Sequence, residues 1–166
     1  MTTLASTTLM NRSSLLRFSV IGGLITGMLH LIVQIGIVFV LILKTPFISS
    51  FQYIASGAMG NAAFTGGLAT ALLGLVLDFI MTTIMAGVFI LSADRITLLR
   101  QHVIPGSLLY GFGVFVVMNF IVLPLSAAPP LPAPPMWLFI EIILGHILLI
   151  GLPLGILVQR NANTNQ

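Results

Sequence analysis

Cysteine is absent from this sequence of 166 residues, and charge is scarce. Without cysteine the chain can form no disulfide, thiolate metal site, covalent c-type haem attachment or cysteine nucleophile. Asp, Glu, Lys and Arg together make up 5% of the residues, whereas a soluble domain carries roughly 25%. With 58% hydrophobic residues and a mean hydropathy of +1.17, the composition indicates an integral membrane protein.

Sequence signals of enzymes and nucleic-acid-binding proteins are also missing. There is no Walker loop, dinucleotide fingerprint or nucleophile elbow, and we interpret the GFG at residues 111–113 as helix packing. The net charge of +3 comes from dispersed basic residues, with no basic run among exposed aromatics. We therefore expect no enzyme activity, no catalytic residues, no metal, no cofactor and no nucleic-acid partner.

Four apolar stretches are each long enough to cross a hydrocarbon core of roughly 30 Å, which takes about 20 helical residues. They are residues 18–43, 65–93, 103–125 and 136–158. A signal peptide is the competing interpretation of the first stretch. Its 26 residues exceed the roughly 7 to 15 of a cleavable signal, however, and no A-x-A-like site follows it. We therefore interpret it as an uncleaved transmembrane helix.

Two connecting segments have distinct compositions. In residues 44–64, apolar side chains at helical spacing predict a short helix lying at the membrane interface, and glycines would also permit a re-entrant segment. Residues 126–135 contain five of the nine prolines and no charge, which predicts a stiff, extended connector. A ligand for a proline-recognition domain is the alternative interpretation of that connector.

The predicted fold is all-α: a four-transmembrane-helix bundle with a short interfacial helix between helices 1 and 2. Residues 1–17 would form a cytoplasmic lead, 18–160 the membrane domain and 161–166 a cytoplasmic tail. Lys44 would be the one basic residue on the outer side, where it can snorkel at its helix end. The positive-inside rule then places both termini in the cytoplasm of a bacterial inner membrane. The basic residues on the inner side are Arg12, Arg17, Arg95, Arg100 and Arg160.

Polar side chains inside the apolar stretches are the candidate functional residues. Asp78 falls near mid-membrane, where insertion of an Asp costs about 2.5 to 3.5 kcal/mol, so it needs a partner, a proton or a wet cavity. Helix directions predict two tiers, one near mid-membrane and one about a turn nearer the outer face. The first tier contains His30, Asp78 and His146, and the second contains Gln34, Asn119 and Glu141.

Three interpretations of this polar cluster remain open. It can be an interhelical hydrogen-bonded clamp, a proton or ion pathway, or a metal or bis-His haem site, although no ligand spacing supports the last. The glycine pairs Gly23/Gly27 and Gly151/Gly155 predict close helix packing, and they would supply the contact faces of a dimer. The leading hypothesis is a structural or accessory membrane protein, and the alternative is a proton- or ion-linked transporter acting as an oligomer.

Three phrases within residues 20–160, IASG, MNFIVLPLSA and GHxxxxGLP, resemble a group of small, uncharacterised four-helix bacterial inner-membrane proteins. The proline connector, Trp137 and the Gly-His of helix 4 are more distantly similar to the YagU-like inner-membrane family. In the first group, helix 1 usually carries Asp at the position of His30, and helix 2 carries His at the position of Asp78. An exchange that keeps one Asp and one His implies that these two side chains touch.

Overall fold

The computed structural model describes residues 11–130 and 133–164, and this part of the chain contains helices and no β-strand. Four helices are long and apolar enough to cross a membrane: Arg12–Ile42, Gly67–Arg95, Val103–Leu125 and Met136–Asn161. The all-α, four-helix prediction is therefore confirmed. Residues 1–10 of the predicted lead and 165–166 of the predicted tail lie outside the described residues.

The first membrane helix comprises α1 (Arg12–Leu29) and its continuation η1 (His30–Ile42), in which the backbone hydrogen bonds widen to the i→i+5 pattern. It begins six residues before the predicted start at Phe18. The cause is Asn11, whose side chain accepts hydrogen bonds from the Ser14 backbone N–H (2.8 Å) and the Ser13 hydroxyl (2.7 Å). This N-cap satisfies donors that would otherwise be unpaired at the helix start, so the predicted lead is partly helical.

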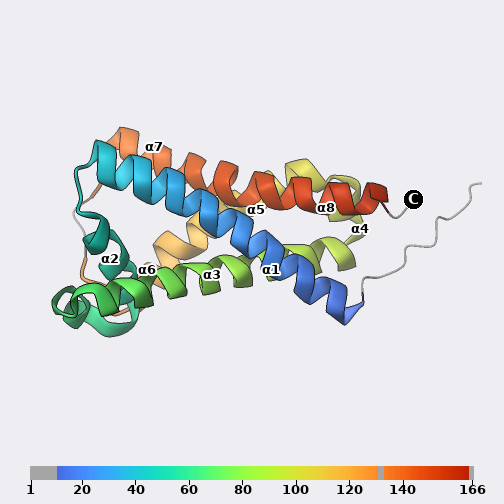
Figure 1. Ribbon diagram of the computed structural model, residues 1–166. Helices are drawn as coiled ribbons and strands as arrows, with labels where there is room; N and C mark the ends of the chain where they lie inside the picture. The colour runs from blue at the N-terminus through green and yellow to red at the C-terminus, as the bar shows by residue number, and fades with distance from the viewer. Residues whose placement is uncertain (1–10, 131–132, 165–166) are drawn as a thin grey trace, which may run out of the picture.

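The predicted interfacial helix is α2 (Phe47–Met59), and a 3₁₀ turn, η2 (Gly60–Thr65), links it to the second membrane helix, α3 (Gly67–Arg95). Gly60 and Gly67 take positive φ values of 60° and 58°, which only glycine adopts without cost. These two positions turn the chain back, so that α2 lies across one end of the bundle (Figure 1).

The third and fourth membrane helices also contain wide i→i+5 turns. The third comprises α5 (Val103–Val117), η3 (Met118–Val122) and α6 (Leu123–Leu125), and the fourth comprises α7 (Met136–Gly145), η4 (His146–Gly151) and α8 (Leu152–Thr164). Each wide turn ends two residues before a proline, Pro124 in the third helix and Pro153 in the fourth. A proline ring lacks an N–H and clashes with the carbonyl four residues back, and a wide turn accommodates both effects. Most of the predicted tail, up to Thr164, continues α8.

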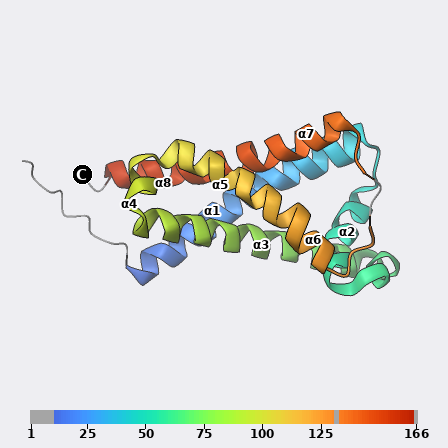
Figure 2. The same cartoon turned by 180° about the vertical axis from the view of Figure 1, so that it is seen from behind.

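Figures 1 and 2 show how the helices are arranged. The helix α3 and the α7–α8 helix run in the same direction, α1–η1 crosses them on one side, and α5–α6 crosses them on the other. A short helix, α4 (Thr97–Gln101), connects α3 to α5 at the end where α1 begins and α8 finishes. The helix α2 and the proline connector occupy the opposite end, where the Ala127 N–H donates to the Gly57 carbonyl at 2.9 Å.

Close contact between α1 and α3 depends on Gly23 and Gly27, which are both buried. A Cβ atom at Gly27 would lie 2.7 Å from Cδ1 of Phe79 and 3.0 Å from the Thr82 hydroxyl. Gly23 is pressed against Thr83 in the same way. A larger residue at Gly23 would meet the Thr83 backbone and push the two helices apart. A larger residue at Gly27 would displace the Phe79 and Thr82 side chains.

Gly151 and Gly155 of the last helix pack against Ser107 of α5. A Cβ at Gly151 would also lie 3.3 Å from the Gly111 Cα, so both backbones meet at glycine. The four glycines of the two predicted pairs thus pack helices within one chain. The expectation that they form faces for a second copy was wrong, because their neighbours inside the bundle already cover them. The adjoining apolar core is formed by Ala86, Phe89, Ile90, Val114, Ile150 and Leu154.

Candidate functional site

The predicted contact between helix 1 and helix 2 is present. His30 Nδ1 lies 2.9 Å from Asp78 Oδ1, and the side chains of these residues are 26% and 9% exposed. The geometry at Nδ1 is not that of a hydrogen bond, so the interaction is a close polar contact between the imidazole and the carboxylate. The other carboxylate oxygen, Oδ2, is buried and has no hydrogen-bond partner among the described residues.

Equal depth explains why these two residues meet. Counting back from Ile42 to His30 gives 12 residues, and counting from Gly67 to Asp78 gives 11, so both lie at a similar distance from the same end of the bundle. The tight glycine contact between α1 and α3 then brings the helix faces together just inside this level. A buried carboxylate in an apolar region requires such a partner.

Helix 1 carries a second polar contact one turn farther along. The Gln34 side-chain N–H donates to Glu141 Oε2 of α7 at 3.1 Å, and Gln34 is 8% exposed. Gly145 makes room for this contact, because a Cβ there would lie 2.9 Å from the Gln34 side-chain oxygen. Helix 1 is therefore tied by polar side chains to two different neighbours, α3 and α7.

The remaining two predicted cluster residues bond to their own helices. Asn119 donates to the Phe115 carbonyl at 2.9 Å, and His146 Nδ1 lies 2.8 Å from the Ile142 carbonyl. A carbonyl only accepts, so His146 Nδ1 carries the proton that is donated in that bond. The His146 ring also packs edge-on against Phe115, with ring centroids 5.7 Å apart.

The predicted six-residue cluster is thus organised as two interhelical pairs, one in each tier, plus two residues bonded within their own helix. Among the described residues, no group of three or more His, Asp or Glu side chains could hold a metal ion. The two interhelical pairs supply hydrogen bonding and polar pairing between helices.

Sequence reasoning missed a buried carboxylate at the opposite end of α3. A charge at the end of a membrane helix ordinarily lies exposed at the interface, but the Asp94 side chain is only 3% exposed. Its oxygens lie 3.5 Å from Arg95 Nε and 3.9 Å from Arg100 Nη2, and Arg100 also donates to the Asp94 carbonyl. An acidic residue followed by two arginines at a helix end was the available signal, since such groups can fold a turn back on itself.

A second missed residue is Gln52, which is 5% exposed and docks α2 onto α3. Its side-chain N–H donates to the Gly67 carbonyl at 3.0 Å, where α3 begins. On the same helix, burial raises the pKa of the Tyr53 phenol above its ordinary value of 10, and its hydroxyl has no hydrogen-bond partner among the described residues. The available signal was that Gln52 and Tyr53 are polar residues inside a largely apolar segment.

The chain matches no protein-family model, no curated protein and no solved structure. Function must therefore be argued from the polar pairs and their place in the bundle.

Proposed function

We propose that this protein is a small, non-enzymatic inner-membrane protein in which two polar pairs clamp helix 1 to its neighbours, in a structural or accessory role. The observation that carries the proposal is the pair of contacts from one helix: His30 to Asp78 of α3, and Gln34 to Glu141 of α7. In an apolar environment such contacts are worth about 0.6 to 2 kcal/mol each and fix the register of the helices.

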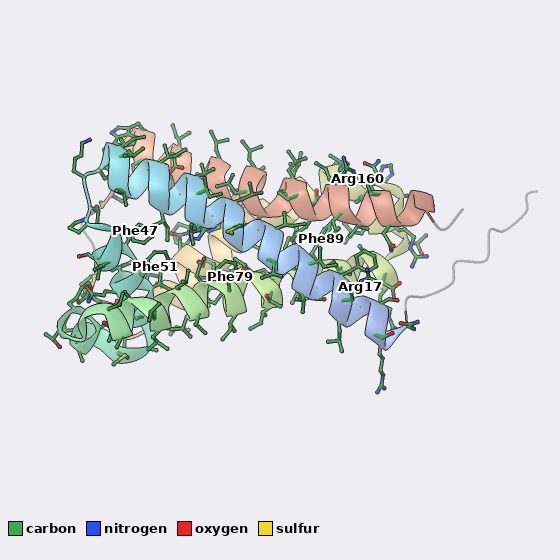
Figure 3. The ribbon with its side chains drawn as sticks, viewed as in Figure 1. Arg17, Phe47, Phe51, Phe79, Phe89 and Arg160 are labelled. Carbon is green, nitrogen blue, oxygen red and sulfur yellow. The ribbon has the colours of Figure 1, made fainter. Side chains whose placement is uncertain are left out.

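The charge distribution supports an orientation in which the first helix begins and the last helix ends on the cytoplasmic side. Arg17 and Arg160 lie at the same end of the molecule, opposite Phe47 and Phe51 (Figure 3). Arg12, Arg95 and Arg100 belong to elements at that same end, whereas Lys44 follows the outer end of η1. An excess of basic residues is typical of the cytoplasmic side of a bacterial inner membrane.

The resemblance to small four-helix bacterial inner-membrane proteins supports the same proposal. In that group the Asp is on helix 1 and the His is on helix 2, the reverse of this chain. The two positions concerned, His30 and Asp78, are in contact here. A clamp needs only that one partner be acidic and the other an imidazole, so it survives the exchange. We therefore also propose membership of that group, with a more distant YagU-like relationship.

Proton- or ion-linked transport by an oligomer is the second candidate function. It is favoured by the buried Asp78 Oδ2, which lacks a hydrogen-bond partner among the described residues, and by the quarter of the His30 side chain that stays exposed. A carboxylate beside an accessible imidazole can pass a proton, and ionisable residues within membranes frequently mark such pathways.

Proton flux in liposomes, measured from pH 5 to 8, separates the two functions. The wild type is compared with Asp78→Asn and with Asn119→Ala, a control whose hydrogen bond stays within its own helix. The clamp predicts wild-type flux equal to that of protein-free liposomes and a lower melting temperature for Asp78→Asn. Wild-type flux that persists in Asn119→Ala and disappears in Asp78→Asn would overturn the clamp in favour of transport.

A further inference from the structure

An apolar groove opens between η1, α2 and the start of α3. Its empty volume is about 380 Å³, including the open mouth. Every residue that lines it is apolar: Leu31 on η1, Phe47, Ile48 and Phe51 on α2, and four residues of α3 between Leu68 and Leu75. Several of these side chains face outward, since Leu68 is 63% and Leu72 53% exposed.

On its α3 side the groove follows the axis of that helix. Its α3 residues span Leu68 to Leu75, which is about 10 Å of helix, starting one residue after α3 begins. It therefore extends from the outer end of the bundle toward the His30–Asp78 level, with Leu31 next to His30 at its deep end. This direction and depth are those of a lipid acyl chain that enters from the outer leaflet.

The basic residue nearest to this groove along the chain is Lys44. Lys44 is exposed and precedes Phe47 by three residues, so their Cα atoms are at most about 11 Å apart. It adopts a φ of 57°, and it is the only basic side chain at this end among the described residues, since the other five belong to elements at the opposite end. An ammonium group there can meet a lipid phosphate while the acyl chain lies in the groove below.

We propose that the groove formed by η1, α2 and α3 binds one acyl chain of an anionic phospholipid of the outer leaflet, with the lipid phosphate paired to Lys44. The site rests on membrane insertion and on the orientation proposed above, but not on the role of the His30–Asp78 pair. It fits a negatively charged headgroup because the groove offers no polar partner of its own and Lys44 supplies one positive charge.

Quenching of tryptophan by brominated lipids tests this site. The reporter is Leu72→Trp in a Trp137→Phe background, and the matched control is Leu73→Trp, which sits at the same depth but does not line the groove. Each protein is reconstituted with brominated phosphatidylglycerol or phosphatidylcholine carrying the same acyl chains. One lysine near a membrane surface contributes about 1 kcal/mol toward an anionic lipid, so we expect about a fivefold preference for phosphatidylglycerol at the reporter and none at the control.

Two variants complete the test. Lys44→Gln, a change at an exposed side chain, should reduce the preference to about one while phosphatidylcholine still quenches. Ala71→Phe should fill the groove and reduce quenching by both lipids at the reporter alone. The proposal is overturned by equal quenching by both lipids, by an equal preference at reporter and control, or by a preference that survives Lys44→Gln. Quenching that rises when the protein is diluted in lipid would identify a second copy of the chain as the occupant, and would overturn it too.

Discussion

His30 and Asp78 reach each other from two antiparallel helices at the same depth, with Nδ1 and Oδ1 2.9 Å apart. Each partner compensates for the presence of the other, since either alone would be a polar group in an apolar region. The interaction is a property of the pair, so it should be measurable as a coupling between the two positions rather than as the effect of one substitution.

A double-mutant cycle on His30→Leu and Asp78→Asn should give a coupling free energy of about 0.6 to 2 kcal/mol. The measurement is unfolding of the purified protein in mixed micelles. The exchanged variant, His30→Asp with Asp78→His, should be more stable than either single variant, because it restores one acid and one imidazole. Effects that add to within about 0.5 kcal/mol would show that the pair does not act as a unit.

The Gln34–Glu141 contact depends on an acceptor at position 141, not on charge. Glu141→Gln keeps a side-chain oxygen and should preserve stability, whereas Gln34→Leu leaves a carboxylate without its donor and should cost about 1 to 3 kcal/mol. Thermal unfolding in detergent compares the two variants directly. If Glu141→Gln proved the more damaging change, the carboxylate charge itself would be required.

The contact between the last helix and α5 should not tolerate a methyl group at Gly151. Gly151→Ala places a Cβ 3.2 Å from the Ser107 carbonyl carbon and 3.3 Å from the Gly111 Cα, so the helices must separate. We expect a loss of about 1 to 3 kcal/mol. Gly113→Ala is the matched control on α5, because its Cβ meets nothing within 4 Å, and it should unfold at or above the wild-type temperature. Equal melting temperatures for the two variants would contradict the packing described.

The stability of the protein should respond differently when the hydroxyl is removed from each of its two tyrosines. Tyr110 donates to the Met85 carbonyl at 2.7 Å and joins α5 to α3, so Tyr110→Phe should lower stability by about 1 kcal/mol. The Tyr53 hydroxyl is buried and has no partner among the described residues, so Tyr53→Phe should be neutral or stabilising. Melting temperatures of the two variants test this, and a marked loss in Tyr53→Phe would reveal a partner for that hydroxyl.

The absence of cysteine makes the proposed orientation easy to test with single-cysteine variants. Thr97→Cys lies in α4 at the arginine-rich end, and Ala133→Cys lies in the proline connector at the other end, and both positions are exposed. In intact spheroplasts a membrane-impermeant maleimide should label Ala133→Cys and spare Thr97→Cys until the membrane is opened. The reverse pattern would invert the proposed topology.

Much of the fold follows from local sequence. The long apolar runs predict the four helices, and the helix directions place His30 and Asp78 at one depth. The boundaries were less predictable, because the start of α1 depends on the capping geometry of Asn11, which an apolar window does not detect. The wide i→i+5 turns before Pro124 and Pro153 were also not predicted, because an apolar run does not distinguish them from a regular α-helix.

The candidate site was likewise predictable only in part from the sequence. Sequence identified the six polar residues and their two tiers, and the resemblance paired His30 with Asp78, but nothing in the sequence assigned partners within the second tier. Glu141 meets Gln34, while Asn119, at a similar depth, turns back to its own backbone. Partner choice depends on how each helix is rotated about its axis, and that rotation is set by glycine contacts between elements far apart in sequence.

By itself, the sequence determined that the chain has four apolar helices, that charge is concentrated at one end, and that an acid and an imidazole lie at mid-depth. These are consequences of composition and of a rise of 1.5 Å per helical residue. Only the tertiary structure decided that helix 1 is tied to both α3 and α7, that Asp94 is buried, and that an apolar groove opens beside α2. These features depend on helix rotation and close approach, which are set by packing between distant segments and not by any local pattern.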